Sequence, residues 1–159
     1  MGRKRLAAIE LATQPSVMKV VIRPMRSADV ETCLALWQAS DGVVLRDGSD
    51  QPAALLAFLE RNPGLSWVAE ASPRELVGAL LCGHDGRRAY LYHLAVRKDW
   101  RRFGCGRGLV NAALAGLQQT GIRRCHAFVA VENEAGARFW EALGADRRED
   151  IALFTLRPE

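Results

Sequence analysis

The spacing of apolar and polar positions divides the chain into short segments with strand or helix periodicity. Runs of strand length, rich in β-branched or aromatic residues, cover residues 19–23, 65–71, 75–82, 89–96, 123–131 and 151–156. Between these runs, apolar residues recur at helical spacing within residues 27–37, 52–59, 109–117 and 133–143. The resulting order, β-α-α-β-β-β-α-β-α-β, predicts a mixed α/β (α+β) fold. Its sheet is largely antiparallel, with one parallel crossover around the third helix.

Residues that begin or end helices stand where this pattern requires them. Ser27 is placed to cap the first helix, and Pro52 suits the first turn of the second. Gly121 follows the third helix, Asn133 precedes the fourth, and Gly144 follows the fourth. The segment between the first two helices is rich in acids and turn formers, so it is predicted to be a loop.

The stretch from Ala89 to Leu109 is predicted to form a strand, a glycine-rich turn and the start of a helix. Glycines let the main chain approach a ligand closely, and the first N–H groups of a helix have no internal partner. Because the helix dipole and the arginines add positive charge, this turn favours an anion such as phosphate. The predicted anion seat consists of Arg101, Arg102, Phe103, Gly104, Cys105, Gly106, Arg107 and Gly108.

Two well-known phosphate-binding motifs do not fit this turn. A P-loop requires Lys followed by Ser or Thr after its last glycine, whereas Gly108 is followed by Leu109 and Val110. The dinucleotide-binding fingerprint requires a third glycine three residues after the second, where this chain has Leu109. A nucleotide-binding domain nevertheless stays open as an alternative, because Glu132 follows a later strand, where a ribose-binding acid would stand.

Composition indicates one ordinary globular domain. Of the 159 residues, 49% are hydrophobic and 25% are charged, and the net charge of +4 does not indicate nucleic-acid binding. No span reaches transmembrane length and the four cysteines lack metal-ligand spacing, so we expect no membrane insertion, no metal and reduced thiols in a cytoplasmic protein. Residues 1–17 are predicted to be a poorly ordered extension and not a signal peptide, since Glu10 interrupts a short apolar stretch. The single domain then spans residues 18–159.

The glycine-rich turn resembles the signature of the GCN5-related N-acetyltransferases, the GNAT family, which is Arg/Gln-x-x-Gly-x-Gly/Ala after a strand that ends in Val. The matching residues here are Arg101, Gly104 and Gly106, preceded by Val96. A second motif of that family, Asn-x-x-Ala-x-x-Phe-Tyr-x-x-x-Gly-Phe, is similar to a segment of the fourth helix. That segment is written here as Asn133, Gly136, Phe139, Trp140, Gly144 and Ala145.

The resemblance implies a GNAT-like fold, with a six- to seven-stranded, mostly antiparallel sheet and helices on both faces. Its central parallel pair of strands would splay at the fourth strand, and acetyl-coenzyme A would lie in that gap as cosubstrate. The pantetheine would pair with the strand near Leu94 and Ala95, and the pyrophosphate would rest on N–H groups from Arg102 to Gly108. The implied coenzyme-binding residues are Leu94, Ala95, Val96, residues 101–108 of the anion seat, Asn133 and Trp140.

The same resemblance implies N-acetyltransfer by direct attack. A primary amine attacks the thioester in a ternary complex, and the backbone N–H of Leu94 stabilises the oxyanion. In relatives a Tyr protonates the leaving thiolate, but Trp140 stands in its place and has no usable acidic proton. A catalytically idle acyl-coenzyme A-binding protein is therefore an alternative to an enzyme. The acceptor is expected to be a small-molecule or peptide amine, and the family's exposed sheet edges allow for a homodimer.

Side chains of the central strand are the candidates for handling the amine's proton. We expect Tyr92 or Tyr90, which share one face of this strand, to organise a water relay, with Glu132 and His93 as weaker candidates. The ordinary structural roles are a pocket wall for the tyrosines and a structural histidine at position 93. Cys105 stands near a helix start among arginines, where its pKa would fall, but no His or carboxylate accompanies it in sequence, so we expect no nucleophile.

Overall fold

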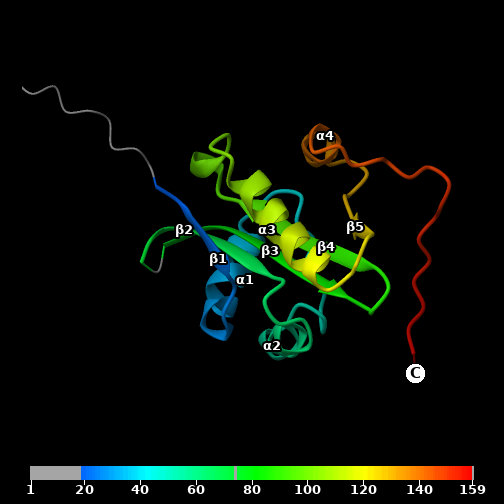
Figure 1. Cartoon of the computed structure of the whole chain (residues 1–159), viewed down its shortest axis with the longest axis horizontal. Helices are drawn as coiled ribbons and strands as arrows, with labels where there is room; N and C mark the ends of the chain where they lie inside the picture. Colours follow the sequence, from blue (N-terminus) through cyan, green and yellow to red (C-terminus); the bar gives the residue numbers. More distant parts are fainter. Residues whose placement is uncertain (1–18, 74, 159) are drawn as a thin grey trace, which may run out of the picture.

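The computed structural model describes residues 19–73 and 75–158, and its strands form one sheet (Figure 1). The predicted extension, residues 1–17, lies outside the described residues. The strands are β1 (Val21–Pro24), β2 (Trp67–Ser72), β3 (Glu75–His84), β4 (Ala89–Val96) and β5 (Cys125–Ala127). They follow the order β1-β2-β3-β4-β5; the first three neighbouring pairs are antiparallel and β4 pairs with β5 in parallel. The mixed α/β fold class is thereby confirmed.

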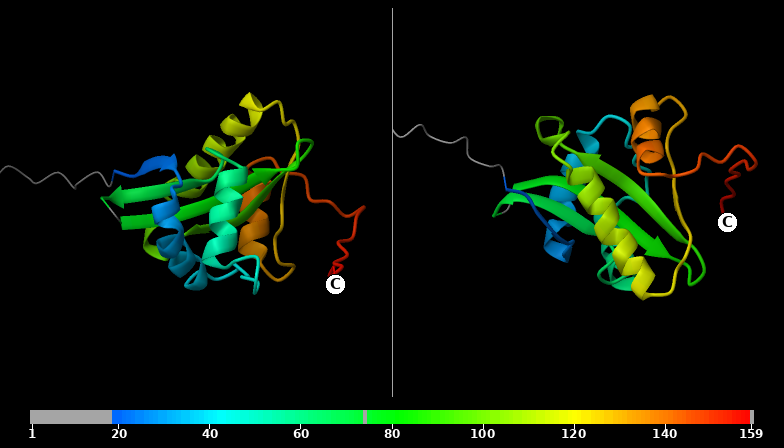
Figure 2. Two further views of the ribbon diagram at one scale, coloured as in Figure 1. Left: turned by 90° about the horizontal axis from the view of Figure 1, so that it is seen from below. Right: turned by 45° about the horizontal axis from the view of Figure 1, so that its top comes forward.

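Helices cover both faces of the sheet, as expected (Figure 2). The helices α1 and α2 lie on one face, and α3 and α4 lie on the other. No helix among the described residues is long and apolar enough to cross a membrane. Their bounds, with two short 3-10 turns, are η1 (Ser27–Asp29), α1 (Val30–Gln38), α2 (Pro52–Arg61), η2 (Lys98–Trp100), α3 (Cys105–Gln119) and α4 (Glu134–Ala142).

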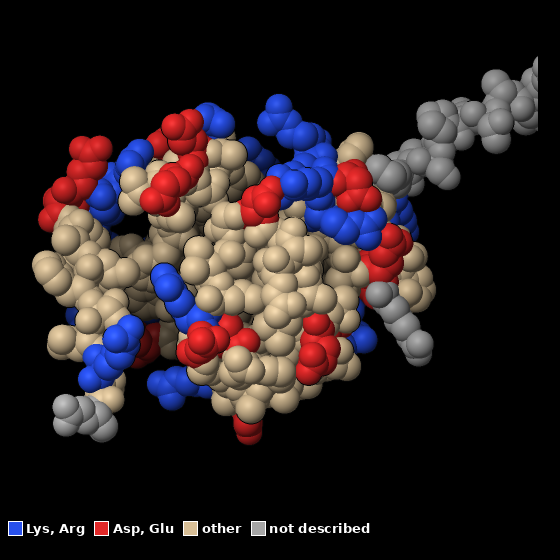
Figure 3. Space-filling model, turned by 180° about the vertical axis from the view of Figure 1, so that it is seen from behind, with Lys and Arg blue, Asp and Glu red and all other residues tan. Residues whose placement is uncertain are grey.

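Within residues 19–73 and 75–158 the sheet has five strands, so the prediction of six or seven strands is wrong in number. β5 covers three residues and not the whole of 123–131, because the chain leaves β4 after Ala127. Residues 151–156 form no strand, since so short a β5 offers no long straight edge for pairing. Seen from behind, a hollow separates this last segment from the body of the molecule (Figure 3). Its apolar side chains are 64–92% exposed, namely Ile151, Leu153, Phe154 and Leu156.

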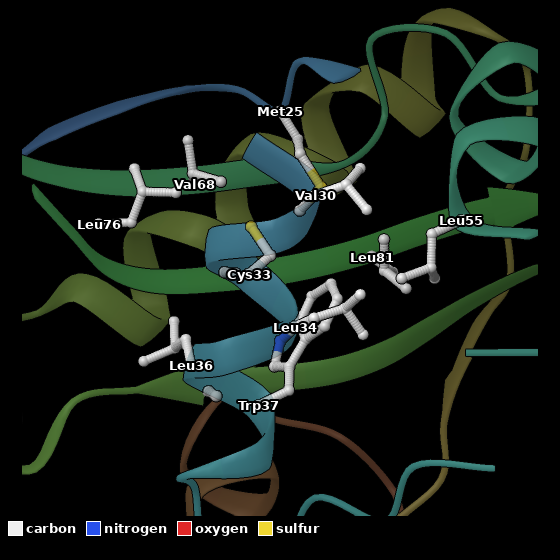
Figure 4. Packing of buried hydrophobic residues seen from close by; sticks show 12 residues of the cluster. Met25, Val30, Cys33, Leu34, Leu36, Trp37, Leu55, Val68, Leu76 and Leu81 are labelled. Atoms are coloured by element: carbon white, nitrogen blue, oxygen red, sulfur yellow. The ribbon is translucent and has the colours of Figure 1, made fainter. Parts of the chain in front are cut away.

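Two hydrophobic cores hold the helices to the sheet, one on each face. In the first, Cys33, Leu34 and Trp37 point from α1 toward the inner strands (Figure 4). In the second, Leu109 and Leu117 of α3 are fully or almost fully buried against the opposite face. Burial of a large apolar side chain contributes about 1.5–3 kcal/mol, so these two clusters fix the sheet between the helix pairs.

Asp29, and not the predicted Ser27, holds the start of α1. The prediction of a Ser27 cap is wrong, because Ser27 opens a 3-10 turn and α1 begins three residues later. The Asp29 carboxylate accepts hydrogen bonds from the Arg23 guanidinium at 2.7 and 2.9 Å and from the Arg26 N–H at 2.7 Å. Arg23 also donates to Glu70 at 2.8 Å. This network ties the helix start to β1 and β2.

β4 is distorted where the coenzyme site was expected. On its β3 side, Ala79 pairs with Ala95 but Leu81 pairs with Tyr92, so β4 carries an additional residue at a β-bulge. The backbone of His93 at this bulge is left-handed, with φ of 54°. On its other side β4 pairs with β5 only as far as Leu91, so the rest of β4 has no strand partner there in the part of the chain that the structure describes. The predicted splay of the central pair is therefore present.

Candidate active site

The glycine-rich turn places free backbone N–H groups beside the open half of β4. Arg102 and Gly104 both have left-handed backbone, with φ of 68° and 81°. The first hydrogen bond of α3 runs from the Gly108 N–H to the Gly104 carbonyl oxygen at 2.9 Å. The N–H groups of Cys105, Gly106 and Arg107 therefore precede the helical ladder, whereas the Gly108 N–H, which was expected in the seat, is already used. Such a turn is a ready site for an anion.

Glycine is required at the three positions of the turn for different structural reasons. A side chain at Gly104 would meet no atom within 4 Å, so its left-handed backbone is what requires glycine. A side chain at Gly106 would meet the Phe139 ring of α4 at 3.1 Å, and one at Gly108 would meet Ile22 of β1 at 3.3 Å. Gly104 thus shapes the turn, while Gly106 and Gly108 let α3 approach its neighbours.

Basic side chains surround this turn. Arg101 donates from Nε to the Val96 carbonyl oxygen at 3.0 Å, which fixes the turn to the end of β4. Arg102 and Arg107 are exposed, and no ion pair among the described residues includes either of them. Basic side chains gather at the upper right of Figure 3, where η2 and the start of α3 lie. A cavity of about 340 Å³ adjoins them and is lined by Leu36, Ala39, Ser40, Val96, Arg97, Lys98, Asp99 and Arg101.

Asn133 begins α4 and meets the loop between α1 and α2. Its Oδ1 accepts a hydrogen bond from the Gly136 N–H at 2.9 Å, which confirms its predicted place at the helix start. On the other side it lies against Gly42, whose added side chain would overlap the Asn133 amide. Trp140 is half-buried, and its ring packs edge-on against Phe139 with centroids 5.3 Å apart. Trp140 therefore belongs to the core that holds α4.

The two candidate tyrosines lie together on β4 in an aromatic cluster. Tyr90 and Tyr92 have ring centroids 6.1 Å apart, and both stack with Phe128, at 5.9 and 6.0 Å. Burial raises the pKa of Tyr92, and the neighbouring Tyr90 raises it further. At neutral pH Tyr92 is then a phenol that donates a hydrogen bond, which suits a water relay and excludes a phenolate base. A second cavity, of about 250 Å³, is lined by Phe58, Arg61, Asn62, Gly83, His84, Asp85, Tyr90 and Tyr92.

His93 has a partner that the sequence did not reveal. Its Nε2 lies 2.6 Å from Oδ1 of Asp50, and the two side chains are only 15% and 9% exposed. The Trp37 ring of α1 covers the imidazole, with centroids 5.3 Å apart. Forty-three positions separate the pair in sequence, so only the acidic character of the loop signalled it. Glu132, the other weaker candidate, is exposed in the turn before α4.

Cys105 is a buried core residue. Cys105 is 5% exposed, and burial raises its pKa, contrary to the expected lowering at a helix start. A raised thiol pKa means little thiolate at neutral pH, so no nucleophile is present at this position. Among the described residues, no three His, Cys, Asp or Glu side chains are grouped so that they could hold a metal ion.

The sequence of this chain is similar to the sequences of known acetyltransferases. Residues 30–145 match the model of the acetyltransferase (GNAT) family. An acetyltransferase from Pectobacterium atrosepticum is 32% identical over 136 residues, which is 83% of this chain and 92% of that protein. One from Sodalis glossinidius is 31% identical over 140 residues, which is 86% of this chain and 94% of that protein.

Solved structures share the fold at lower sequence identity. A complex of the aminoglycoside-type enzyme AAC(6')-Iy with a bisubstrate analogue has a TM-score of 0.70 and 18% identity, covering 88% of this chain and 99% of that one. The NatC complex bound to Gag peptide and coenzyme A has a TM-score of 0.70 and 22% identity, covering 83% and 87%. The fold, the splayed strand and the matched family model agree, so the chain belongs to the GNAT acetyltransferase family.

Proposed function

We propose that this protein is an N-acetyltransferase that moves an acetyl group from acetyl-coenzyme A to a primary amine within a ternary complex. The observation that carries the proposal is the juxtaposition of two sets of backbone groups that lack a strand or helix partner among the described residues. One is the open half of β4 beyond Leu91, and the other is the set of N–H groups at the start of α3. An extended pantetheine arm needs the first, and a diphosphate needs the second.

The coenzyme would bind along these two features. Its diphosphate rests on the N–H groups from Arg102 to Arg107, with the exposed arginines adding charge. Its pantetheine pairs with β4 along residues 94–96, and the side chain of Asn133 contacts the pantetheine arm or the phosphate side. The acetyl group then lies near the bulge at His93 and Leu94.

The reaction is direct transfer between bound substrates. The neutral amine attacks the thioester carbonyl, the Leu94 N–H stabilises the oxyanion, and the bond to sulfur breaks as the amide forms. The amine loses one proton and the coenzyme leaves as a thiolate. A thiol pKa of about 8.5 makes that departure feasible without a dedicated acid, which fits a chain that has Trp140 in place of the usual Tyr.

Tyr92 or Tyr90 would direct the amine's proton to solvent through ordered water. The two phenols share the face of β4 that is turned toward α2, where Phe58 packs edge-on against Tyr92 at 6.2 Å. The stacked rings border one side of the site, and their hydroxyls can both donate to and accept from an ordered water. The acceptor is a small-molecule or peptide amine; structural neighbours include an aminoglycoside N-acetyltransferase with a bisubstrate analogue and the NatC complex bound to Gag peptide.

Calorimetry and thiol release together test this proposal. We expect coenzyme A to bind the protein, NAD to show no binding, and free thiol to appear from acetyl-coenzyme A with at least one amine in a panel of peptides, polyamines and aminoglycosides. Binding of coenzyme A without thiol release would favour the idle acyl-coenzyme A-binding protein, which Trp140 makes the second candidate. Binding of NAD and not coenzyme A would overturn the assignment.

A further inference from the structure

The loop between α1 and α2, residues 39–51, lies against Asn133 near its start and is hydrogen-bonded to β4 near its end. Near its start, Gly42 lies against Asn133 at the beginning of α4. Near its end, Asp50 is hydrogen-bonded to His93 on the bulge of β4. Val43 and Leu45 between them pack on the core under α1. The loop therefore spans from β4 to α4 across the open half of the central strand pair.

Each oxygen of the Asp50 carboxylate has a hydrogen-bond partner. Oδ1 lies 2.6 Å from Nε2 of His93, and Oδ2 accepts a hydrogen bond from the Arg46 N–H within the loop. Since an ionised carboxylate only accepts hydrogen bonds, Nε2 of His93 carries the proton. The same carboxylate thus closes a turn of the loop and connects that turn to β4.

The contact between Asp50 and His93 also affects the β4 backbone at His93 and Leu94. Its φ of 54° is uncommon for a residue other than glycine, and it immediately precedes Leu94. A side chain fixed by Asp50 on one side and by the Trp37 ring on the other opposes relaxation of that backbone. The direction of the Leu94 N–H then depends on the loop.

We propose that Asp50 is a positioning residue. Through its hydrogen bond to His93 it holds the 39–51 loop across the gap and fixes the β4 bulge, so that the Leu94 N–H faces the thioester carbonyl. The inference rests on the proposed function for its catalytic consequence, whereas the anchoring itself does not depend on the reaction.

Asp50→Asn and His93→Asn test the proposal, with Asp47→Asn as the matched control. Asp47 is an exposed carboxylate of the same loop, and D47N makes the same charge change as D50N. Asn tolerates left-handed backbone, so H93N keeps the bulge but cannot reach Asp50. In hydrogen exchange we expect residues 39–51 to exchange on the order of tenfold faster in D50N and H93N than in D47N, as suits the loss of a charged hydrogen bond.

Turnover supplies the second readout. With the amine that the wild type acetylates fastest, kcat should fall on the order of tenfold in D50N and H93N. Coenzyme A has a free thiol and no thioester carbonyl, so its Kd should stay within about twofold of the wild-type value. The kcat of the double variant should be no lower than that of either single variant, since both substitutions remove the same hydrogen bond.

Each possible result decides a separate claim. Exchange in residues 39–51 equal to that of D47N would overturn the anchoring. Faster exchange with unchanged kcat would overturn the positioning role alone. A wild type that binds coenzyme A but acetylates no amine would overturn the proposed enzyme and, with it, the catalytic part of this inference, while the exchange result would still report on the anchoring.

Discussion

Asp29 shows how one buried carboxylate can connect three elements. Burial alone would raise its pKa, but hydrogen bonds from Arg23 and from the Arg26 N–H outweigh burial and hold the pKa below its ordinary value. A lowered pKa in the folded state means that the charged form stabilises the fold. This contribution is present above about pH 4, the ordinary pKa of Asp, and is lost as the pH falls through the lowered value.

Asp29→Asn should therefore destabilise the protein at pH 7 by about 2 kcal/mol, the usual size for hydrogen bonds to a charged group. The difference from the wild type should shrink as the pH falls below about 4, because the wild type then loses its charge as well. Urea denaturation across this pH range measures both effects. Glu31→Gln, an exposed acid in the first turn of α1, is the control and should change stability little; a pH-independent deficit for D29N would contradict the account.

Tyr92→Phe and Tyr90→Phe test the water relay. Loss of the relevant hydroxyl should lower kcat roughly a hundredfold, as is typical for a group that moves a proton. The ring stack with Phe128 remains, so the Kd for coenzyme A should be unchanged. If kcat stays within twofold of the wild type in both single variants and in the double variant, the tyrosines are only a pocket wall.

Sequence reasoning at this scale succeeded where function depends on local spacing. The turn at Gly104 and the place of Asn133 at a helix start both follow from a few neighbouring residues. The Ser27 cap failed because Asp29, two residues later, had a better partner in Arg23. The contact between Asp50 and His93 depends on a bulge and a loop path, and no local pattern encodes either.

The turn between β4 and α3 has left-handed backbone at Gly104, with open space around that residue. Gly104→Ala adds a side chain that meets no atom, so its cost comes only from the left-handed backbone, about 1–2 kcal/mol. Relaxation of this turn would reorient the N–H groups after it. We expect G104A to weaken coenzyme A binding at least tenfold by calorimetry.

Gly121→Ala is the matched control for that variant. Gly121 also has positive φ, 79°, and open space around it, but it ends α3 and does not begin it. G121A should lower the stability by a similar amount and leave the Kd for coenzyme A unchanged. Equal losses of affinity in both variants would mean that global destabilisation, and not the anion seat, explains the effect.

Periodicity predicted the helices and the inner strands well, but it predicted the strands of the C-terminal third less well. The ranges of α1, α2 and β4 agree closely with their apolar patterns, since each has one clear buried face. β5 and residues 151–156 carry equally apolar patterns but do not extend the sheet. Pairing of these segments depends on the path of the chain after the splay, which alternation alone does not specify.

For the molecule as a whole, coenzyme binding should appear as added stability. A ligand that binds only the folded state at one hundred times its Kd adds about 2.7 kcal/mol. In a domain of this size that corresponds to a rise in Tm of roughly 5–10 °C. Differential scanning fluorimetry with coenzyme A measures the rise, and NAD at the same concentration should give none. A rise with NAD alone would favour a nucleotide-binding protein.

The unpaired half of β4 also has a consequence for handling the protein. Backbone N–H and C=O groups without a strand partner are a template on which another extended chain can pair, and this is a common start of aggregation. A pantetheine arm lying on the same groups would block that route. Purification and storage with coenzyme A should therefore keep the preparation monodisperse for longer than storage without it, and light scattering over days would record the difference.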